Sequence, residues 1–491
     1  MNKAPAPVPS CLHRGVAALL WISLTLVLSF SAAGAEPVKR PNILFCLADD
    51  WAWPHAGVYG DRVVRVPNFE RVAREGALFT RAFSAAPSCT PSRAAMLTGR
   101  AVHQLEQGAM LWGFLPKKFE TYPDILERAG YVVGHTRKGW GPGNFQAGGW
   151  PRNPAGPQSK SFEEFLKKVP ADKPFCFWFG SQDPHRPYTD GSGLKSGLKS
   201  DQVHLPAYWP DAPEVRSDVL DYYWKVERFD REVGDLLKLL TERGELDNTF
   251  IVVSGDNGWP FPRCKANLYD CGTHQPLAIR WPARFQGGKI IDDFVCLNDL
   301  APTFLELAGL PPAKEMTATS LLPLLEGKPA PGRDHIFLER ERHANVRPGD
   351  ASYPSRAIRT KAFLYIRNLR PDRWPAGDPE MWKAVGPFGD CDNGPTKDFI
   401  LAHRDQPQFS KFFKWCFAKR PAEELYDLAA DPDELDNVAA VARYASAKKK
   451  LRDELDRWMR DTNDPRAFND DDHWDQFPYF GDSRPMPVSA K

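Results

Sequence analysis

Residues 42–50 of this 491-residue chain read Asn-Ile-Leu-Phe-Cys-Leu-Ala-Asp-Asp. The apolar side chains follow one another without the alternation of a half-exposed strand, which predicts a central parallel strand buried on both faces. Similar short apolar runs follow at 131–133, 175–179, 250–253 and 277–281. Because open α/β sheets place their sites at the carboxyl ends of their strands, Asp49 and Asp50 are candidate site residues.

Helical patterns separate these runs. Asn68 is expected to cap a helix that runs through Ala73 and stops at Gly76, and Thr121 is expected to open another. A long amphipathic stretch covers 219–243, and a shorter one covers 300–308. Strands that alternate with helices predict an α/β fold, with a mostly parallel sheet sandwiched by helices.

The pattern changes near residue 330. Residues 327–332 form a Pro- and Gly-rich link. Two short strands are predicted within 357–367, a third over 424–428, and an amphipathic helix over 444–460. We therefore expect a catalytic domain over 36–330, a C-terminal α+β subdomain with a small antiparallel sheet over 331–462, and a tail over 463–491.

Residues 1–35 have the pattern of a secretory signal peptide. Lys3 and Arg14 precede an apolar run over 16–30, and Ala33-Gly34-Ala35 supplies a cleavage site. The run is shorter than the ~20 residues that span a bilayer, which argues against a membrane anchor. The chain also has no Asn-X-Ser/Thr sequon. We expect a periplasmic or secreted protein that has no membrane attachment after cleavage.

The overall charge of the chain is close to zero. Lys and Arg number 64 and Asp and Glu number 63, so the formal net charge is +1. No global field then favours nucleic acid or an anionic membrane. The binding of an anion would depend on a few local cations.

Residues 89–100 read Cys-Thr-Pro-Ser-Arg-Ala-Ala-Met-Leu-Thr-Gly-Arg. Pro91 suits the first turn of a helix and Gly99 suits its end, which places Cys89 at the positive end of the helix dipole. Arg93 lies four residues later, on the same face. A reactive group beside a guanidinium suits a tetrahedral oxyanion, although a single cysteine near a helix start is usually a buried structural thiol.

The complete dodecapeptide resembles the signature of type I sulfatases, C-x-P-S-R followed by L-T-G-R. In that family, which has an alkaline-phosphatase-like fold, a maturation enzyme oxidises the cysteine to formylglycine (3-oxoalanine). The hydrated aldehyde then offers a gem-diol that attacks sulfur, and its second hydroxyl expels sulfate. The resemblance implies that Cys89 undergoes this change and that the chain is a sulfatase.

Asp49 and Asp50 match one metal-binding motif of that family, and Asp256 and Asn257 match another. On their own such residues also commonly cap turns. By the resemblance, the four are ligands of Ca²⁺, with Mg²⁺ as the alternative, and the modified Cys89 completes the set. Hard oxygen ligands suit both ions.

Three further residues match substrate-binding positions of the family. His185 corresponds to a histidine that assists the leaving group, and Lys138 and Lys265 correspond to lysines that bind the sulfate. Trp140 departs from the pattern, because a histidine that contacts the formylglycine is usual there. The nearby histidines that could substitute for it are His103 and His135.

Several segments are most similar to the heparan N-sulfatase (sulfamidase) branch, namely 183–186, 261–269 and 353–360. This similarity implies that the substrate is an N-sulfoglucosamine of heparan- or heparin-type glycans. Sugar contacts from the second domain are expected from Arg356 and His343, with Glu339 and Arg342. Surface charges would explain these four equally well. Aromatic rings that could stack on a sugar are Trp51, Trp53 and Trp112, although packing in the core explains them equally well.

Other functions stay open on the sequence alone. One alternative is an O-sulfatase that acts on another sulfated polysaccharide. Another is a phosphate or phosphonate ester hydrolase of the same superfamily. A third is a non-catalytic glycan-binding protein, if Cys89 is left unmodified.

Overall fold

The computed structural model describes residues 40–381, 386–469 and 471–481. These residues belong to one compact unit that begins at Arg40. The predicted signal peptide, residues 1–35, lies outside the described residues. Among the helices that are described, none combines the length and the apolar character that a membrane span requires.

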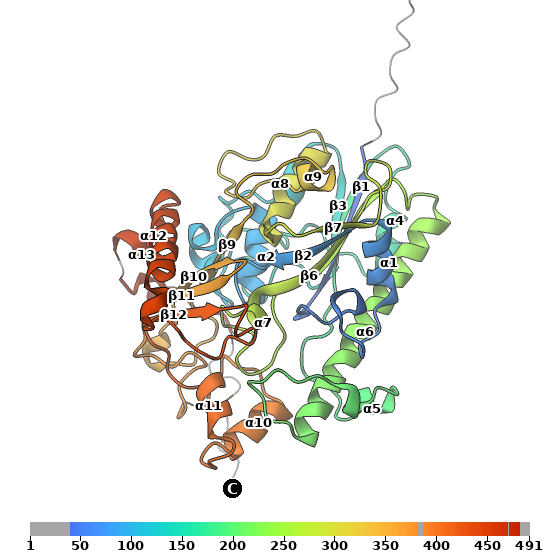
Figure 1. Ribbon diagram of the computed structural model, residues 1–491. Helices are drawn as coiled ribbons and strands as arrows, with labels where there is room; N and C mark the ends of the chain where they lie inside the picture. Colours follow the sequence, from blue (N-terminus) through green and yellow to red (C-terminus); the bar gives the residue numbers. More distant parts are fainter. Residues whose placement is uncertain (1–39, 382–385, 470, 482–491) are drawn as a thin grey trace, which may run out of the picture. The chain divides into compact units, whose positions relative to one another are not determined.

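The larger sheet has the strand order β3-β4-β1-β5-β6-β2-β7, with β8 beside β2. Strands β1, β2, β3, β6 and β7 of this sheet are labelled in Figure 1. Neighbours from β3 to β5 are parallel, whereas β6 is antiparallel to both β5 and β2. The mostly parallel sheet is therefore confirmed. Its strands are β1 (Asn42–Ala48), β2 (Ala77–Phe83), β3 (Val132–Arg137), β4 (Phe175–Gly180), β5 (Thr249–Gly255), β6 (His274–Arg280), β7 (Lys289–Ile291) and β8 (Val295–Cys296).

Helices cover both faces of this sheet. Leu44 and Cys46 of β1 belong to the core beneath α1 and α6, whereas Ile43 and Phe45 belong to the core beneath α2, α3 and α8. Each face of β1 is thus fully buried, as its unbroken apolar run predicts. The helices of this region are α1 (Pro67–Glu75), α2 (Cys89–Thr98), α3 (Tyr122–Arg128), α4 (Phe162–Leu166), α5 (Ser192–Lys195), α6 (Pro213–Glu242), α7 (Asp270–Thr273), α8 (Leu300–Leu307) and α9 (Leu322–Leu325).

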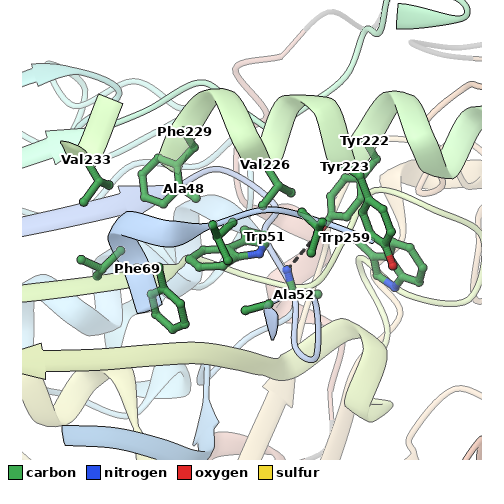
Figure 2. Packing of buried hydrophobic residues seen from close by; sticks show 14 of the residues in the cluster. Ala48, Trp51, Ala52, Phe69, Tyr222, Tyr223, Val226, Phe229, Val233 and Trp259 are labelled. Atoms are coloured by element: carbon green, nitrogen blue, oxygen red, sulfur yellow. Dashed lines mark hydrogen bonds between the residues drawn. The ribbon is translucent and has the colours of Figure 1, made fainter. Parts of the chain in front are cut away.

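Aromatic residues join α6 to the loop that follows β1 (Figure 2). The indole of Trp51 packs edge-on against Phe69, with ring centroids 4.9 Å apart, and lies 5.6 Å from Phe229. The hydroxyl of Tyr222 accepts a hydrogen bond from the amide of Ala52 at 3.1 Å. This packing fixes the loop that leaves the carboxyl end of β1.

The start of α1 differs from the prediction. The helix begins at Pro67, and Asn68 is already its second residue. A carboxylate from α6 caps the helix instead, because Asp230 accepts hydrogen bonds from the amides of Asn68 at 3.1 Å and Phe69 at 2.8 Å. A cap that comes from a distant helix leaves no signal in the local sequence.

The smaller sheet is antiparallel and has the order β12-β11-β10-β9. One of its faces packs against α12, and the other contributes Leu338 and Ala357 to a core that it shares with Phe83 of the larger sheet. The predicted small antiparallel sheet and helix are thus present. The elements are β9 (His335–Arg340), β10 (Ser355–Thr360), β11 (Phe363–Asn368), β12 (Glu423–Asp427), α10 (Pro395–Ala402), α11 (Ser410–Cys416), α12 (Ala445–Asp461) and α13 (Pro465–Phe468).

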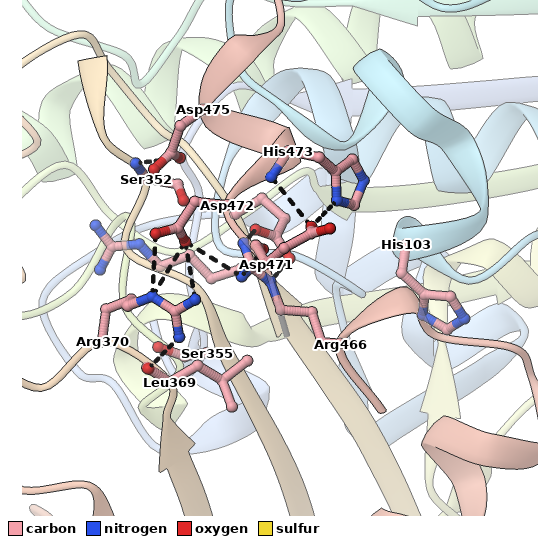
Figure 3. A network of polar contacts seen from close by, with 12 residues as sticks. His103, Ser352, Ser355, Leu369, Arg370, Arg466, Asp471, Asp472, His473 and Asp475 are labelled. Atoms are coloured by element: carbon pink, nitrogen blue, oxygen red, sulfur yellow. Dashed lines mark hydrogen bonds and ion pairs between the residues drawn. The ribbon is translucent and has the colours of Figure 1, made fainter. Parts of the chain in front are cut away.

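The described part of the C-terminal tail is held by polar contacts (Figure 3). Arg370 pairs with Asp472 at 3.0 Å, and Asp475 accepts a hydrogen bond from the amide of Ser352 at 2.7 Å. Trp474 is buried in the core that lies beneath α2, α3 and α8 of the larger sheet. These contacts bring residues 477–480 to the edge of the cleft described below.

Candidate active site

The acidic residues meet where two neighbouring strands end. Asp49 and Asp50 follow β1, and Asp256 follows β5, its parallel partner. Cys89 begins α2, and its Sγ lies 3.4 Å from Oδ1 of Asp49 and 3.8 Å from Oδ1 of Asp50. The thiol and the three carboxylates each offer a ligand atom within 4.8 Å of the others. The structure therefore brings together groups that lie far apart in the chain.

Asn257 completes this cluster. Its Nδ2 donates to Oδ1 of Asp50 at 2.7 Å and to the carbonyl of Gly258 at 2.9 Å. Its Oδ1 is buried and has no hydrogen-bond partner within the described chain. A buried acceptor without a donor is costly unless a cation binds it. Together with three carboxylates, this oxygen fits a hard divalent cation such as Ca²⁺ or Mg²⁺.

The backbone at Asp50 is shaped to complete the cluster. Its φ is 74°, in the left-handed region that Asp tolerates better than most residues. Its amide donates to Oδ1 of Asp256 at 2.9 Å. The turn thereby locks the two strand ends together.

Arg93 lies beneath the cluster and is fully buried. Its Nε donates to Oδ2 of Asp256 at 2.7 Å, and Nη1 donates to the carbonyls of Lys138 and Gly139, each at 2.9 Å. Nη2 lies 3.5 Å from Oδ1 of Asp49. The guanidinium therefore joins the cluster to the segment that carries Lys138.

Two lysines flank the acidic residues. Nζ of Lys138 contacts both oxygens of Asp49, at 2.7 and 2.6 Å, and Nζ of Lys265 contacts Oδ2 of Asp50 at 2.7 Å. Burial alone would lower the pKa of each lysine, but the neighbouring carboxylates outweigh it and raise both pKa values. Burial would likewise raise the pKa of Asp49, but Lys138, His185 and Arg93 hold it well below its usual value. All three groups are therefore charged at neutral pH.

Two histidines line the same cleft. Nε2 of His185 lies 3.7 Å from Oδ2 of Asp50, and about a third of its side chain is exposed. His343 is buried, and its Nδ1 lies 2.8 Å from the hydroxyl of Ser88, the residue before Cys89. Burial lowers the pKa of His343 to about 4, so this imidazole is neutral at neutral pH.

The suggested substitutes for a histidine at position 140 lie elsewhere. Trp140 itself lines the cleft. His103 is bonded to Glu339 at 2.7 Å, and His135 is bonded to the carbonyl of Gly156 at 2.9 Å. Among the described residues that line the cleft, neither histidine appears.

Three expected sugar contacts also need correction. Arg356 is fully buried and pairs with Asp464 at 2.6 Å and with Glu341 at 2.8 Å. Glu339 accepts from His103, and Arg342 donates to the carbonyl of Phe477 at 2.6 Å. These side chains hold the second sheet and the tail in place, so they are not available to a sugar. Of the expected contacts from the second domain, His343 lines the cleft.

The cleft above the cluster has a volume of about 970 Å³. Cys89 and Asp49 lie at its base. The cleft is also lined by Lys225 and Arg228 of α6, by Trp112, and by Tyr479 of the C-terminal tail. Of the three tryptophans that could stack on a sugar, Trp112 lines the cleft, whereas Trp51 is a core residue and Trp53 stacks on His274 at a centroid distance of 4.4 Å.

Asp392 is a cleft residue that the sequence did not reveal. It lies in the loop before α10, and its Oδ2 is 3.4 Å from Nζ of Lys265. Burial opposes its ionisation, but Lys265, His185 and His343 hold its pKa well below the usual value. No motif surrounds it, so only the folded chain shows that it belongs to the site.

Cys89 is a poor nucleophile as a plain thiol. Burial is the largest influence on it and raises its pKa well above the usual value, although Lys138 and Lys265 oppose this. The thiolate, which is the reactive form, is therefore scarce at neutral pH. Nucleophilic chemistry at this position calls for a different functional group.

Comparisons with known proteins agree with this site. A family model described as sulfatase matches residues 41–310, and one described as N-sulphoglucosamine sulphohydrolase, C-terminal, matches residues 255–378. The chain belongs to the sulfatase family, and its class of activity is that of a sulfuric ester hydrolase.

Human N-sulphoglucosamine sulphohydrolase is 29% identical over 94% of this chain and 95% of its own length. An ulvan-active sulfatase of Formosa agariphila is 27% identical over 86% of this chain and 75% of its own. A protein solved in complex with its substrate D-glucosamine-2-N,6-O-disulfate has a TM-score of 0.62 and 20% identity, covering 88% of this chain and 100% of that one. This last likeness confirms the fold.

Proposed function

We propose that this sulfatase removes the N-sulfate group from a glucosamine residue at the non-reducing end of heparan- or heparin-type glycans. The observation that carries the proposal is the convergence of Cys89, the acidic cluster and the lysines Lys138 and Lys265 at the base of one cleft. The choice of an N-sulfated sugar is supported by the match of residues 255–378 and by the near-complete overlap with the human relative.

The proposed chemistry requires two groups. An aldehyde hydrate made from Cys89 supplies the nucleophile, and a divalent cation neutralises negative charge. Asp49, Asp50, Asp256 and Asn257 would hold that cation, with the modified Cys89 as a further ligand. The free oxygen of Asn257 supports this ligand set.

The protein's own side chains have separable roles in this proposal. Lys138 and Lys265 point their ammonium groups at the base of the cleft, where they bind sulfuryl oxygens and stabilise the charge that develops on them. His185 lies at the cleft side of Asp50 and donates a proton to the departing atom. Arg93 orients Asp256 and the backbone at Lys138, so it positions the groups that react.

The cellular setting is part of the same proposal. Residues 1–35 support export to the periplasm or the medium, and oxidation of Cys89 implies an encounter with a formylglycine-generating enzyme. Because Cys89 is buried in the folded chain, we propose that the maturation enzyme acts before folding is complete.

Sulfate release from a panel of substrates tests the function. The purified protein, co-expressed with the maturation enzyme, is expected to release sulfate from N-sulfoglucosamine, and Cys89→Ala is expected to release none. Release from O-sulfated galactans alone would show an O-sulfatase instead. Hydrolysis of phosphate or phosphonate esters in preference to sulfates would show a phosphate or phosphonate ester hydrolase, and binding without turnover would show a glycan-binding protein.

A further inference from the structure

Asp392 is a carboxylate that the proposed chemistry does not use. It stands apart from the four groups of the acidic cluster, but Asp50, His185 and Asp392 each offer an atom within 4.8 Å of the others. Lys265 connects the two aspartates, since its Nζ lies 2.7 Å from Asp50 and 3.4 Å from Asp392. Asp392 therefore lies next to the acidic cluster, on the side that carries His185 and Lys265.

One oxygen of Asp392 lacks a donor. Oδ2 is buried and receives no aligned hydrogen bond from any described residue, because its 3.4 Å contact with Lys265 is an ion pair only. The side chain nevertheless reaches the cleft, where about a fifth of it is exposed. A carboxylate that receives no aligned hydrogen bond at Oδ2 and is partly open to the cleft is expected to accept a hydrogen bond from a ligand through its accessible part.

A negative charge here is unfavourable for sulfate itself. The sulfuryl oxygens carry no hydrogen and would be repelled by Asp392. The atom that links sulfur to the sugar is different, because a sulfamate carries N–H at this atom, whereas a sulfate ester carries an oxygen without hydrogen. Asp392 can accept a hydrogen bond from the N–H of a sulfamate, but it can only repel the linking oxygen of a sulfate ester.

We infer that Asp392 accepts the N–H of the scissile sulfamate and then holds the ammonium group of the product, and that it thereby selects N-sulfated over O-sulfated sugars. The inference rests on the proposed function and adds the residue that sets its specificity. Oxygens of Asp49, Asp50 and Asp256 cannot serve this purpose, because they already face one another and the two lysines.

The net reaction balances in this arrangement. Water and the sulfamate R–NH–SO₃⁻ give R–NH₃⁺ and SO₄²⁻, so that one S–N bond breaks and one S–O bond forms. The nitrogen takes two protons, and both derive from the water. The positive charge that appears on nitrogen forms a charge-assisted pair with Asp392, which an ester product cannot do.

The test compares binding and turnover in Asp392→Asn, which keeps the shape of the side chain and removes its charge. Asp405→Asn, at an exposed position between α10 and α11, is the matched control. In equilibrium titrations, the wild type is expected to bind D-glucosamine about 10- to 100-fold more tightly than D-glucose, and Asp392→Asn is expected to lose this preference. The control variant is expected to keep it.

Steady-state kinetics on two substrates provide an independent test of the same inference. Asp392→Asn is expected to lower kcat/KM for N-sulfoglucosamine by about 10- to 100-fold more than kcat/KM for 4-nitrophenyl sulfate, whose linking atom carries no hydrogen. Equal losses on both substrates, or a wild type that binds glucosamine and glucose alike, would overturn the inference. A wild type that prefers glucosamine but releases no sulfate from N-sulfoglucosamine would instead contradict the proposed function.

Discussion

Replacing Asn257 with alanine is expected to weaken cation binding while leaving the fold intact. In the wild type, Nδ2 of Asn257 donates to Asp50 of the acidic cluster, and Oδ1 of the same amide has no hydrogen-bond partner among the described residues. If this oxygen is one of about five ligands, its loss should weaken Ca²⁺ binding by about 100-fold, or about 2.7 kcal/mol. Without Ca²⁺ the variant loses the 2.7 Å hydrogen bond to Asp50, which costs about 1 kcal/mol.

Unfolding experiments with and without Ca²⁺ separate the effect of the lost Ca²⁺ ligand from the effect of the lost hydrogen bond to Asp50. At a Ca²⁺ concentration 100 times its dissociation constant, the wild type gains about 2.7 kcal/mol, whereas the variant, then at its own dissociation constant, gains only about 0.4 kcal/mol. Asn257→Asp is the matched control, because it keeps an oxygen at this position and should still respond to Ca²⁺. An equal Ca²⁺ response in Asn257→Ala and the wild type would refute the ligand assignment.

Three other substitutions probe the rest of the site and its support. Lys265→Met is expected to lower kcat/KM by about 100-fold or more, because it removes the buried cation to which we assign sulfate binding. A change in kcat/KM below threefold in steady-state kinetics would exclude this role in sulfate binding. His103 has a raised pKa, because Glu339 outweighs the effect of burial. The stability from this pair is full below pH 6.5 and is lost as the pH rises through the folded-state pKa, so denaturant titrations of His103→Gln should show a flatter decline above pH 6.5 than the wild type. Arg356→Met should lower the free energy of unfolding by about 3 to 5 kcal/mol, because it leaves buried carboxylates unpaired. A variant that folds normally and only raises KM would restore Arg356 as a sugar contact.

The sequence predicted the strands that are buried on both faces. Their apolar runs are continuous, and the strand at 42–48 has the expected ends. The sequence did not predict β2, where Thr80 and Arg81 interrupt the apolar pattern, or β9, which is only half buried. The antiparallel direction of β6 depends on pairing between distant segments, so no local pattern could indicate it.

The site was predictable where several residues share one short motif. Asp49, Asp50 and Cys89 lie in segments whose residue types and spacing restrict the chemistry, and the folded chain brings them together. Arg356 was misassigned because an arginine in a strand has the same local sequence whether it faces a ligand or a buried carboxylate. Asp392 was missed because only tertiary structure brings it beside Lys265.

The mass of the peptide that contains Cys89 shows whether the thiol is converted to formylglycine. After co-expression with a formylglycine-generating enzyme, we expect this peptide to be lighter by one H₂S and heavier by one oxygen atom than the unmodified form. The fraction converted should match the fraction of active sites, measured by sulfate release. A fully active enzyme whose Cys89 remains an intact thiol would show that catalysis does not depend on formylglycine.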